Sequence, residues 1–399
     1  MPLQEGIYYQ SGARPGTAFA VVFLRADPTA DSATVGRSLE TLWGVYQGLK
    51  RGVSRDLPNH LFPSGDLTVL LGFGIKAFRI AGAKRSVPPE ALANYGLFRS
   101  PLASGGGPLL IGSGLNYADD VKANPATEEI VVQFIANTQL AVRRAVVETW
   151  KCLSDSGENP PVLSVSTYFS GFQRDDGRSW IDFHDGVSNL KSSERYAVIG
   201  IKPTGDPSTS WTEDGSYMTY VRIHVDLPLW RKLAPDMQSI AVGRSKLTGC
   251  PLTGVDPNGS PLSIAGCPSA PSGEIGQDDG FRETPRNPDP TIATSHVQRV
   301  NRHRGAVEDP NSLRVYRQGF EFLEAWDRSP GFRAGLNFVG FQDTPERLFR
   351  VLTQPGWLGK TNFGGAEQTL PLLKVLAAGI YFVPPDGEHT RFPGQDIFF

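Results

Sequence analysis

Hydrophobic residues along this chain follow two periods, one typical of strands and one typical of helices. Residues 18–24 form a short apolar run rich in β-branched and aromatic side chains, which predicts a buried strand. From residue 38 to 52 the apolar positions recur at helical spacing, which predicts an amphipathic helix. Residues 67–74 predict a second strand, and residues 128–153 predict a long helix. This order indicates an α+β sandwich with helices covering one sheet.

The second half of the chain starts the same order again. Its elements are a strand at 215–226, a helix at 227–240, a strand at 335–341, a helix at 345–354 and a short strand at 380–383. A length of 399 residues allows two domains of ordinary size. We therefore expect a duplicated architecture of two similar α+β domains, residues 1–200 and residues 201–399, although no repeat is visible in the sequence itself.

The overall composition is that of a globular protein without an electrostatic preference for polyanions. Hydrophobic residues make up 39% and charged residues 20% of the chain, which fits a sizeable core. The 39 basic and 41 acidic residues give a net charge of −2, so neither a nucleic-acid nor a membrane role is indicated. The chain has no apolar run of about 18 residues, so no transmembrane helix is expected.

The first six residues and the cysteines bear on the compartment. The start has neither the basic nor the apolar region of a signal peptide, so a cytoplasmic location is the default expectation, and a processed, secreted form stays open. The three cysteines are Cys152, Cys250 and Cys267, without any CxxC pair, so a zinc or iron–sulfur site is not expected. A Cys250–Cys267 bridge would be possible in an oxidising compartment.

Three separated segments could supply an acid, an imidazole and a guanidinium to one site. They are residues 182–186, 295–299 and 313–319. A haem peroxidase needs these three side chains: one to bind iron, one to move a proton and one to stabilise charge on the departing oxygen. Each segment alone has an ordinary interpretation, since Asp185-Gly186 is a common turn signal and a lone histidine is more often a surface or core residue.

Several motifs in the right order resemble the dye-decolorizing, or DyP-type, haem peroxidases. Residues 182–189 look like the family's GxxDG signature and its Asn-containing continuation. Residues 215–252 resemble the stretch that precedes the proximal loop, and His296-Val297 resembles the start of the proximal-histidine segment. Residues 314–319 are similar to the RILRRG-like segment. The likeness runs over nearly the whole chain, and the shared order is more specific than any single motif.

The resemblance implies a fold and an activity. The fold would be α+β, with two ferredoxin-like domains, antiparallel sheets and peripheral helices of the dimeric α/β-barrel type. The cofactor would be haem b, iron protoporphyrin IX, held mainly by the C-terminal domain. The activity would be the reduction of hydrogen peroxide and, through a compound I intermediate, the oxidation of anthraquinone and azo dyes, phenolics and similar one-electron donors.

The resemblance also assigns roles residue by residue. His296 would be the proximal iron ligand, Asp185 the distal acid–base residue and Arg317 the distal arginine. Arg244 would face a haem propionate. The other implied cofactor contacts are Val187, Ser188, Leu336 and Phe338.

Some positions depart from the family pattern or stay open. Asp182 stands where the first glycine of GxxDG is expected, which adds a carboxylate three residues before Asp185. Asp343 and Glu367 are the candidates for a carboxylate that hydrogen-bonds the proximal imidazole. Bulky dyes cannot reach a buried haem, so a surface aromatic residue could be oxidised instead. The candidates are Trp326, Trp357, Tyr316 and Tyr217, although an ordinary core position is the more common role for each of them.

Two other classes of function compete with the peroxidase hypothesis. One is a haem-binding, storage or delivery protein of the same fold with little turnover. The other is an α+β interaction domain without haem, which would make the ordered motifs a coincidence. Exposed sheet faces in such folds also leave homo-oligomerisation open. A Soret band would exclude the interaction domain without haem. Peroxide-dependent dye oxidation would then distinguish the peroxidase from the haem-binding, storage or delivery protein.

Overall fold

The structure is a computed structural model of the chain. It describes residues 3–7, 16–88, 115, 117–118, 120–121, 125–155, 157, 160–186, 189–255, 261–263, 287–300, 313–352, 372–387 and 391–399. Val187, Ser188, Glu367, Trp357 and Cys267 lie outside these residues. None of the described helices is long and apolar enough to cross a bilayer.

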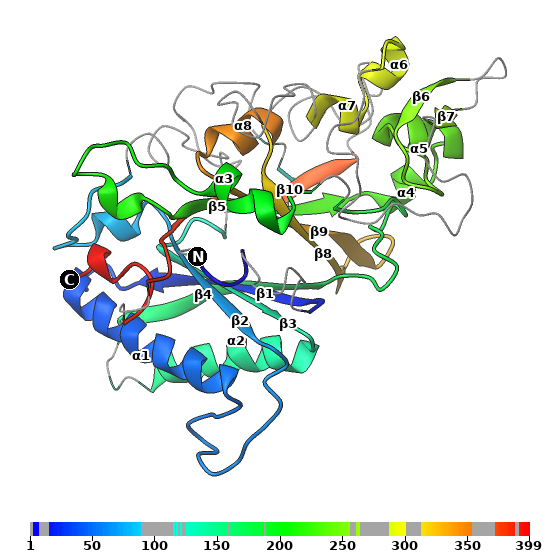
Figure 1. Cartoon of the computed structure of the whole chain (residues 1–399). Coiled ribbons are helices and arrows are strands. Elements are labelled where there is room, and N and C mark those ends of the chain that lie inside the picture. The colour runs from blue at the N-terminus through cyan, green and yellow to red at the C-terminus, as the bar shows by residue number, and fades with distance from the viewer. Residues whose placement is uncertain are drawn as a thin grey trace.

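Eight antiparallel strands close into a barrel in the order β1-β3-β2-β10-β5-β9-β8-β4 (Figure 1). Their bounds are β1 (Ala18–Ala26), β2 (Thr68–Phe73), β3 (Ile130–Ala136), β4 (Leu163–Phe172), β5 (Ser216–Val225), β8 (Tyr316–Ala325), β9 (Phe332–Gln342) and β10 (Leu373–Val383). A separate two-stranded sheet pairs β6 (Leu252–Val255) with β7 (Pro261–Ser263).

The barrel consists of two halves with the same strand order. In the first half the order is β4-β1-β3-β2, and in the second it is β10-β5-β9-β8. When the four strands of each half are numbered along the chain, they lie side by side in the order 4-1-3-2, which is the ferredoxin-like arrangement. The predicted fold class is confirmed. The boundary at residues 200 and 201 falls between helix α3 (Ser192–Ile199) and β5 and stays a prediction.

The two halves meet at two narrow seams. Strand β2 pairs with β10 only at Phe73 and Phe382, and β4 pairs with β8 only at Phe172 and Glu321. Within each half, by contrast, neighbouring strands pair over several residues. Side chains in the shared interior therefore contribute more than backbone pairing to holding the halves together.

Eight helices are described around the barrel. They are α1 (Ser32–Lys50), α2 (Gln139–Ser154), α3 (Ser192–Ile199), α4 (Leu227–Trp230), α5 (Pro235–Val242), α6 (Pro290–Ala293), α7 (His296–Val300) and α8 (Glu346–Leu352), with 3₁₀ turns η1 (Ala77–Arg79), η2 (Ser210–Thr212) and η4 (Gln395–Ile397). Helices α1 and α2 lie along the first half, and α5 to α8 lie on the side of the second half (Figure 1). Asp31 and Thr138 cap the two long helices through their side-chain oxygens.

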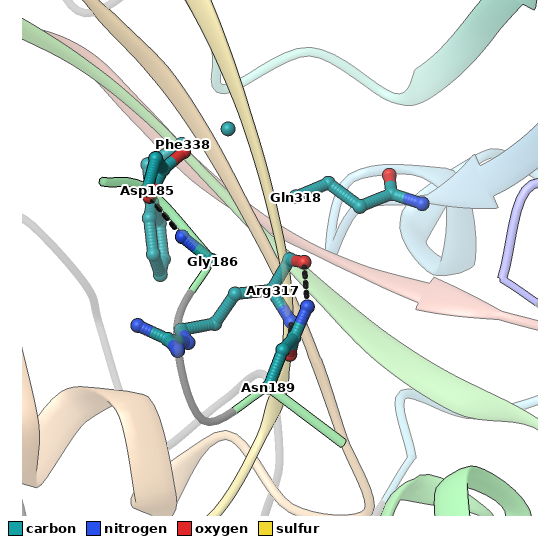
Figure 2. A pocket seen from close by; sticks show the side chains of 7 residues that line it. Asp185, Gly186, Asn189, Arg317, Gln318 and Phe338 are labelled. Carbon is teal, nitrogen blue, oxygen red and sulfur yellow. Dashed lines mark hydrogen bonds between the residues drawn. The ribbon is translucent and has the colours of Figure 1, made fainter. Parts of the chain in front are cut away.

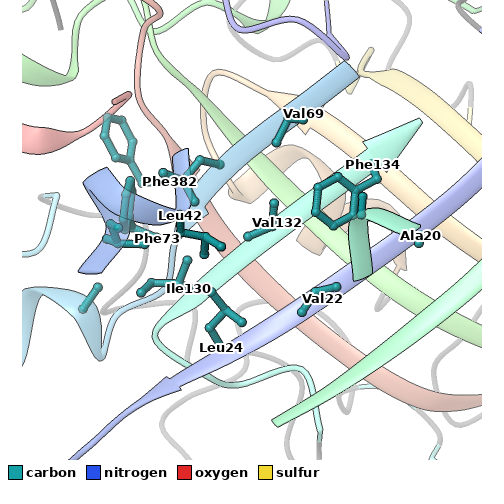
Figure 3. Close-up of a cluster of buried hydrophobic side chains, with 14 of the residues drawn as sticks. Ala20, Val22, Leu24, Leu42, Val69, Phe73, Ile130, Val132, Phe134 and Phe382 are labelled. Atoms are coloured by element: carbon teal, nitrogen blue, oxygen red, sulfur yellow. The ribbon is translucent and has the colours of Figure 1, made fainter. Parts of the chain in front are cut away.

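Strand β1 shows why its sequence is apolar without alternation. Phe19 and Phe23 point into the barrel, where the ring of Phe19 stacks on Phe320 of the other half with centroids 4.3 Å apart. Val22 and Leu24 point outward and pack under α1, in the cluster drawn in Figure 3. Because both faces are buried, both sets of side chains must be hydrophobic.

Two of the predicted helices are wrong in part. The helix predicted at 128–153 is strand β3 followed by α2, and the break comes at Asn137-Thr138, where Thr138 caps α2. The helix predicted at 227–240 is two short helices, because Pro235 can only begin a new helix. Four strands lie where no element was predicted, namely β4, β6, β7 and β8, and β8 carries Arg317.

Candidate functional site

The outer face of β8 and β9 forms the floor of a pocket. Along β8, Arg317, Gly319 and Glu321 share this face, while Gln318 and Phe320 alternate onto the interior side. The register pairs Gly319 with Phe338 of β9. The pocket is partly open to solvent and is lined by Asp185, Gly186, Asn189, Arg317, Gln318, Gly319 and Phe338 (Figure 2).

Asp185 is held against the backbone of β8. A Cβ atom placed on Gly319 would lie 2.1 Å from Oδ2 of Asp185, so the carboxyl fills the space that a side chain would need. Its Oδ1 accepts a hydrogen bond of 2.8 Å from the Gly186 N–H (Figure 2), and the Asp185 N–H donates to the Gly177 carbonyl at 3.0 Å. Only glycine at position 319 allows this approach, and the approach fixes the acid over the pocket.

Arg317 is joined to the Asp185 segment by a two-bond clamp. Asn189 Nδ2 donates to the Arg317 carbonyl at 2.8 Å, and the Arg317 N–H donates to Asn189 Oδ1 at 3.0 Å (Figure 2). The guanidinium is half-buried, and this burial lowers the pKa of Arg317, an effect that the negative charge of Asp185 opposes. The structure therefore brings together the acid and the guanidinium that the sequence predicted for one site.

Asp182 adopts the backbone conformation that favours glycine. Its φ angle is 66°, in the left-handed region, which aspartate tolerates better than most residues. Its carboxylate lies 3.6 Å from Arg174 and 3.4 Å from Lys246. The change from glycine thus keeps the turn that leads to Asp185 and adds two solvent-exposed ion pairs.

His296 is the first residue of α7 and is half-buried. Its pKa is lowered well below the usual range, first by burial and then by the positive charges of Arg317, Arg244 and Arg299. A neutral imidazole is the form that can offer a nitrogen lone pair to a metal ion. His296 is not among the residues that line the pocket, but it lies close enough to Arg317 for the guanidinium charge to lower its pKa.

A close approach between two turns places Arg244 beside the segment of His296. Gly243 ends α5 with a φ of 85°, and a Cβ atom there would lie 2.2 Å from Ser295 Oγ. Only glycine allows the turn after α5 to pack so tightly on Ser295. Arg244 is buried, and its Nη1 donates to the Gly249 carbonyl at 2.8 Å.

The other predicted site residues have mixed outcomes. Phe338 lines the pocket, and Leu336 Cδ1 would lie 3.3 Å from a Cβ atom on Gly319; both side chains are half-buried. Asp343 forms an ion pair with Arg347 at 2.6 Å. Of the aromatic candidates for a surface oxidation site, Tyr217 and Tyr316 are wrong because both are buried, whereas Trp326 is half-buried.

Four residues that line the pocket were not predicted, namely Gly186, Asn189, Gln318 and Gly319, and neither was Glu321 beside it. Asn189 and Gly319 lie inside the two motifs, and their place there was the signal that could have found them. Glu321 follows Gly319 by two residues, which puts it on the same face once residues 316–325 are known to form a strand.

Comparison with known proteins identifies the family of the chain. The family described as "Dyp-type peroxidase, C-terminal" matches residues 176–388, more than half of the chain.

The chain belongs to the DyP-type peroxidase family.

A dye-decolorizing peroxidase of Thermobifida fusca (strain YX) is 27% identical over 218 residues, and the aligned part spans 53% of this chain and 43% of that relative. Ferric DtpA from Streptomyces lividans has a similar structure, with a TM-score of 0.68 at 20% identity over 98% of this chain and 95% of that chain. A DyP-type peroxidase from Cellulomonas bogoriensis has a TM-score of 0.66 at 20% identity over 96% of this chain and 94% of that one. These two structures show the shared fold.

DyP-type peroxidases are haem proteins, and the residues present fit that group. The neutral imidazole of His296 is of the right type to bind a haem iron. Arg244, whose charge reaches His296, is of the right type to face a propionate carboxylate. Half-buried Leu336 and Phe338 offer apolar surface on the side of Asp185 and Arg317.

Proposed function

We propose that the chain is a haem b peroxidase of DyP type that reduces hydrogen peroxide and oxidises dyes, phenolics and similar one-electron donors. The observation that carries this proposal is the meeting of Asp185 and Arg317 at one pocket, with the charge of Arg317 reaching His296. An acid, a cation and a neutral imidazole are the set that peroxide cleavage at a haem requires.

Each residue has a defined task in this proposal. Bound haem would supply the redox-active iron at which the O–O bond is cleaved. A carboxylate oxygen of Asp185 takes the proton that hydrogen peroxide loses on binding and returns it to the oxygen that leaves as water. The Arg317 guanidinium stabilises the negative charge on that oxygen. The Asn189 clamp and Gly319 hold the two groups in place.

The other side of the cofactor has its own set of residues. His296 would bind the iron through one ring nitrogen, and a carboxylate on the other nitrogen would strengthen this donation. Asp343 and Glu367 remain the candidates for that carboxylate, and Arg244 would bind a propionate. Val187 and Ser188 remain predicted cofactor contacts.

The distal assignment is tested by Asp185→Asn and Arg317→Leu. Each variant of the haem-loaded protein should react with hydrogen peroxide about 10²- to 10³-fold more slowly in stopped-flow measurements, because each lacks one of the two groups that act on the peroxide. Asp206→Asn, in an exposed loop, is the matched control. Wild-type rates in both site variants would contradict the assignment.

The ligand assignment is tested by His296→Ala. This variant should lose haem or its normal Soret absorbance after reconstitution, whereas His60→Ala, at an exposed histidine, should keep both. Unchanged haem binding in His296→Ala would remove this residue from the ligand role. A wild-type protein that binds haem but oxidises no dye with peroxide would instead support haem storage or delivery.

A further inference from the structure

Glu321 is a buried carboxyl that the proposed peroxide chemistry does not use. Only 4% of the residue is exposed. Its pairing partners on the neighbouring strands are Phe172 of β4 and Leu336 of β9, and neither carries a charge. A carboxylate in such surroundings loses hydration without gaining a counter-ion from the sheet.

Glu321 also lies beside the distal acid. Asp185 fills the space over Gly319, and Glu321 is the next side chain on the same face of β8. The pKa of Glu321 is raised to about 9, mainly by burial and further by the negative charge of Asp185. Two neighbouring carboxyls in a poorly hydrated space do not both ionise readily.

The groups that favour the charged form of Glu321 do not offset this effect. They are a backbone hydrogen bond from Trp180 and the positive charge of Arg174. Arg174 is already engaged by Asp176 at 2.5 Å and lies 3.6 Å from Asp182. The carboxylates of Asp176 and Asp182 therefore offset most of the positive charge of Arg174 near Glu321.

We propose that Glu321 is a positioning residue that stays protonated beside Asp185 and so keeps the distal site at a single negative charge. This inference rests on the proposed function, in which Asp185 takes the peroxide proton and returns it to the departing oxygen. Glu321 keeps its own proton throughout that exchange. The one carboxylate of Asp185 then faces the one guanidinium of Arg317.

The consequence appears on the alkaline side of neutrality. When Glu321 loses its proton, a second negative charge arises next to Asp185. That charge disfavours the formation of a peroxide anion in the pocket. It also offsets part of the positive charge with which Arg317 stabilises the departing oxygen. The rate of the peroxide reaction should therefore fall as Glu321 ionises.

The protonated state can be measured by infrared spectroscopy of the haem-loaded wild-type protein. Labelling glutamate with ¹³C should shift the carbonyl band of a protonated carboxyl at pH 7, and raising the pH should remove that band. Glu321→Gln should lack the band, and Glu40→Gln, at a surface carboxyl paired with Arg391, should keep it. A labelled wild-type protein without such a band at pH 7 would overturn the proposal, whether or not the variant folds.

The effect on Asp185 is tested by the pH profile of the stopped-flow peroxide reaction. The alkaline fall in rate should move by about one pH unit or more toward higher pH in Glu321→Gln, because glutamine cannot ionise. An identical alkaline limb in both proteins would show that Glu321 does not act through Asp185. If the infrared band behaves as expected but wild type does not react with peroxide, the proposed function fails while the protonated Glu321 stands.

Discussion

The two faces of β8 differ in packing and in chemistry, although they share one backbone. On the interior side, Tyr316 and Phe320 are buried among residues of both halves of the barrel. On the outer side, Arg317 is half-buried and lines a pocket, and the glycine at 319 leaves room for Asp185. The interior face makes a closed contact between the halves, and the outer face leaves space for a ligand.

This difference separates stability from function along a single strand. A substitution on the interior face removes packing between the two halves, whose direct backbone pairing is limited to two narrow seams. A substitution on the outer face changes the position or charge of groups in the pocket. The following variants use this separation, in order of decreasing expected effect.

The stability of the fold should depend on pH through Glu321, the buried carboxyl of the outer face. Its pKa in the folded protein, about 9, lies above the value of 4.5 for an unperturbed side chain, so the unfolded chain releases the proton first as the pH rises. The protonated side chain therefore contributes stability that is fully present below about pH 4.5 and is lost progressively as the pH rises to about 9. Relative to Glu321→Gln, wild type should lose on the order of 5 kcal/mol over this range in denaturant titrations. A constant difference between the two proteins would contradict the raised pKa.

Phe320→Ala should be the most damaging truncation on the interior face. It removes the ring that stacks on Phe19 across the two halves and leaves a cavity, which should cost about 3–5 kcal/mol of unfolding free energy. Leu323→Ala, at an exposed position of the same strand, should change it by no more than about 0.5 kcal/mol. Equal losses in a urea titration would mean that the two positions do not differ in packing.

Gly319→Ala should harm the reaction more than the fold. Its methyl group would collide with Asp185 Oδ2 and push the carboxyl out of position, so the peroxide reaction should slow about 10²-fold. Gly44→Ala is the control, since a Cβ atom there meets nothing within 4 Å and should raise the stability of α1 by about 1 kcal/mol. A rate in Gly319→Ala equal to that of wild type would show that Asp185 does not need this contact.

The smallest effect is expected at Asp182. Glycine and alanine variants both lose the exposed ion pairs with Arg174 and Lys246, which contribute little. Only alanine retains the strain of a positive φ, so Asp182→Gly should be about 1 kcal/mol more stable than Asp182→Ala in thermal unfolding. Equal stabilities would show that the left-handed conformation carries no strain at this position.

Local patterns predicted some elements well and failed at others for a physical reason. Strand β1 and helix α1 have a single consistent period, and the structure has both. Residues 130–136 are apolar except for Gln133 because β3 is buried on both faces, so their pattern also fits a helix. Strand β8 mixes polar and apolar positions because one face lines a pocket, which hid its strand character.

By itself, the sequence determined the family, the duplicated α+β order and the three residues Asp185, Arg317 and His296 as candidates for one site. These depend on motifs and on periods that neighbouring residues define. Closure of the barrel, the seat of Asp185 on Gly319, the Asn189 clamp and the burial of Glu321 were decided only by the tertiary structure. Each of these depends on the register between strands and loops that are far apart in the chain, and no local pattern records that register.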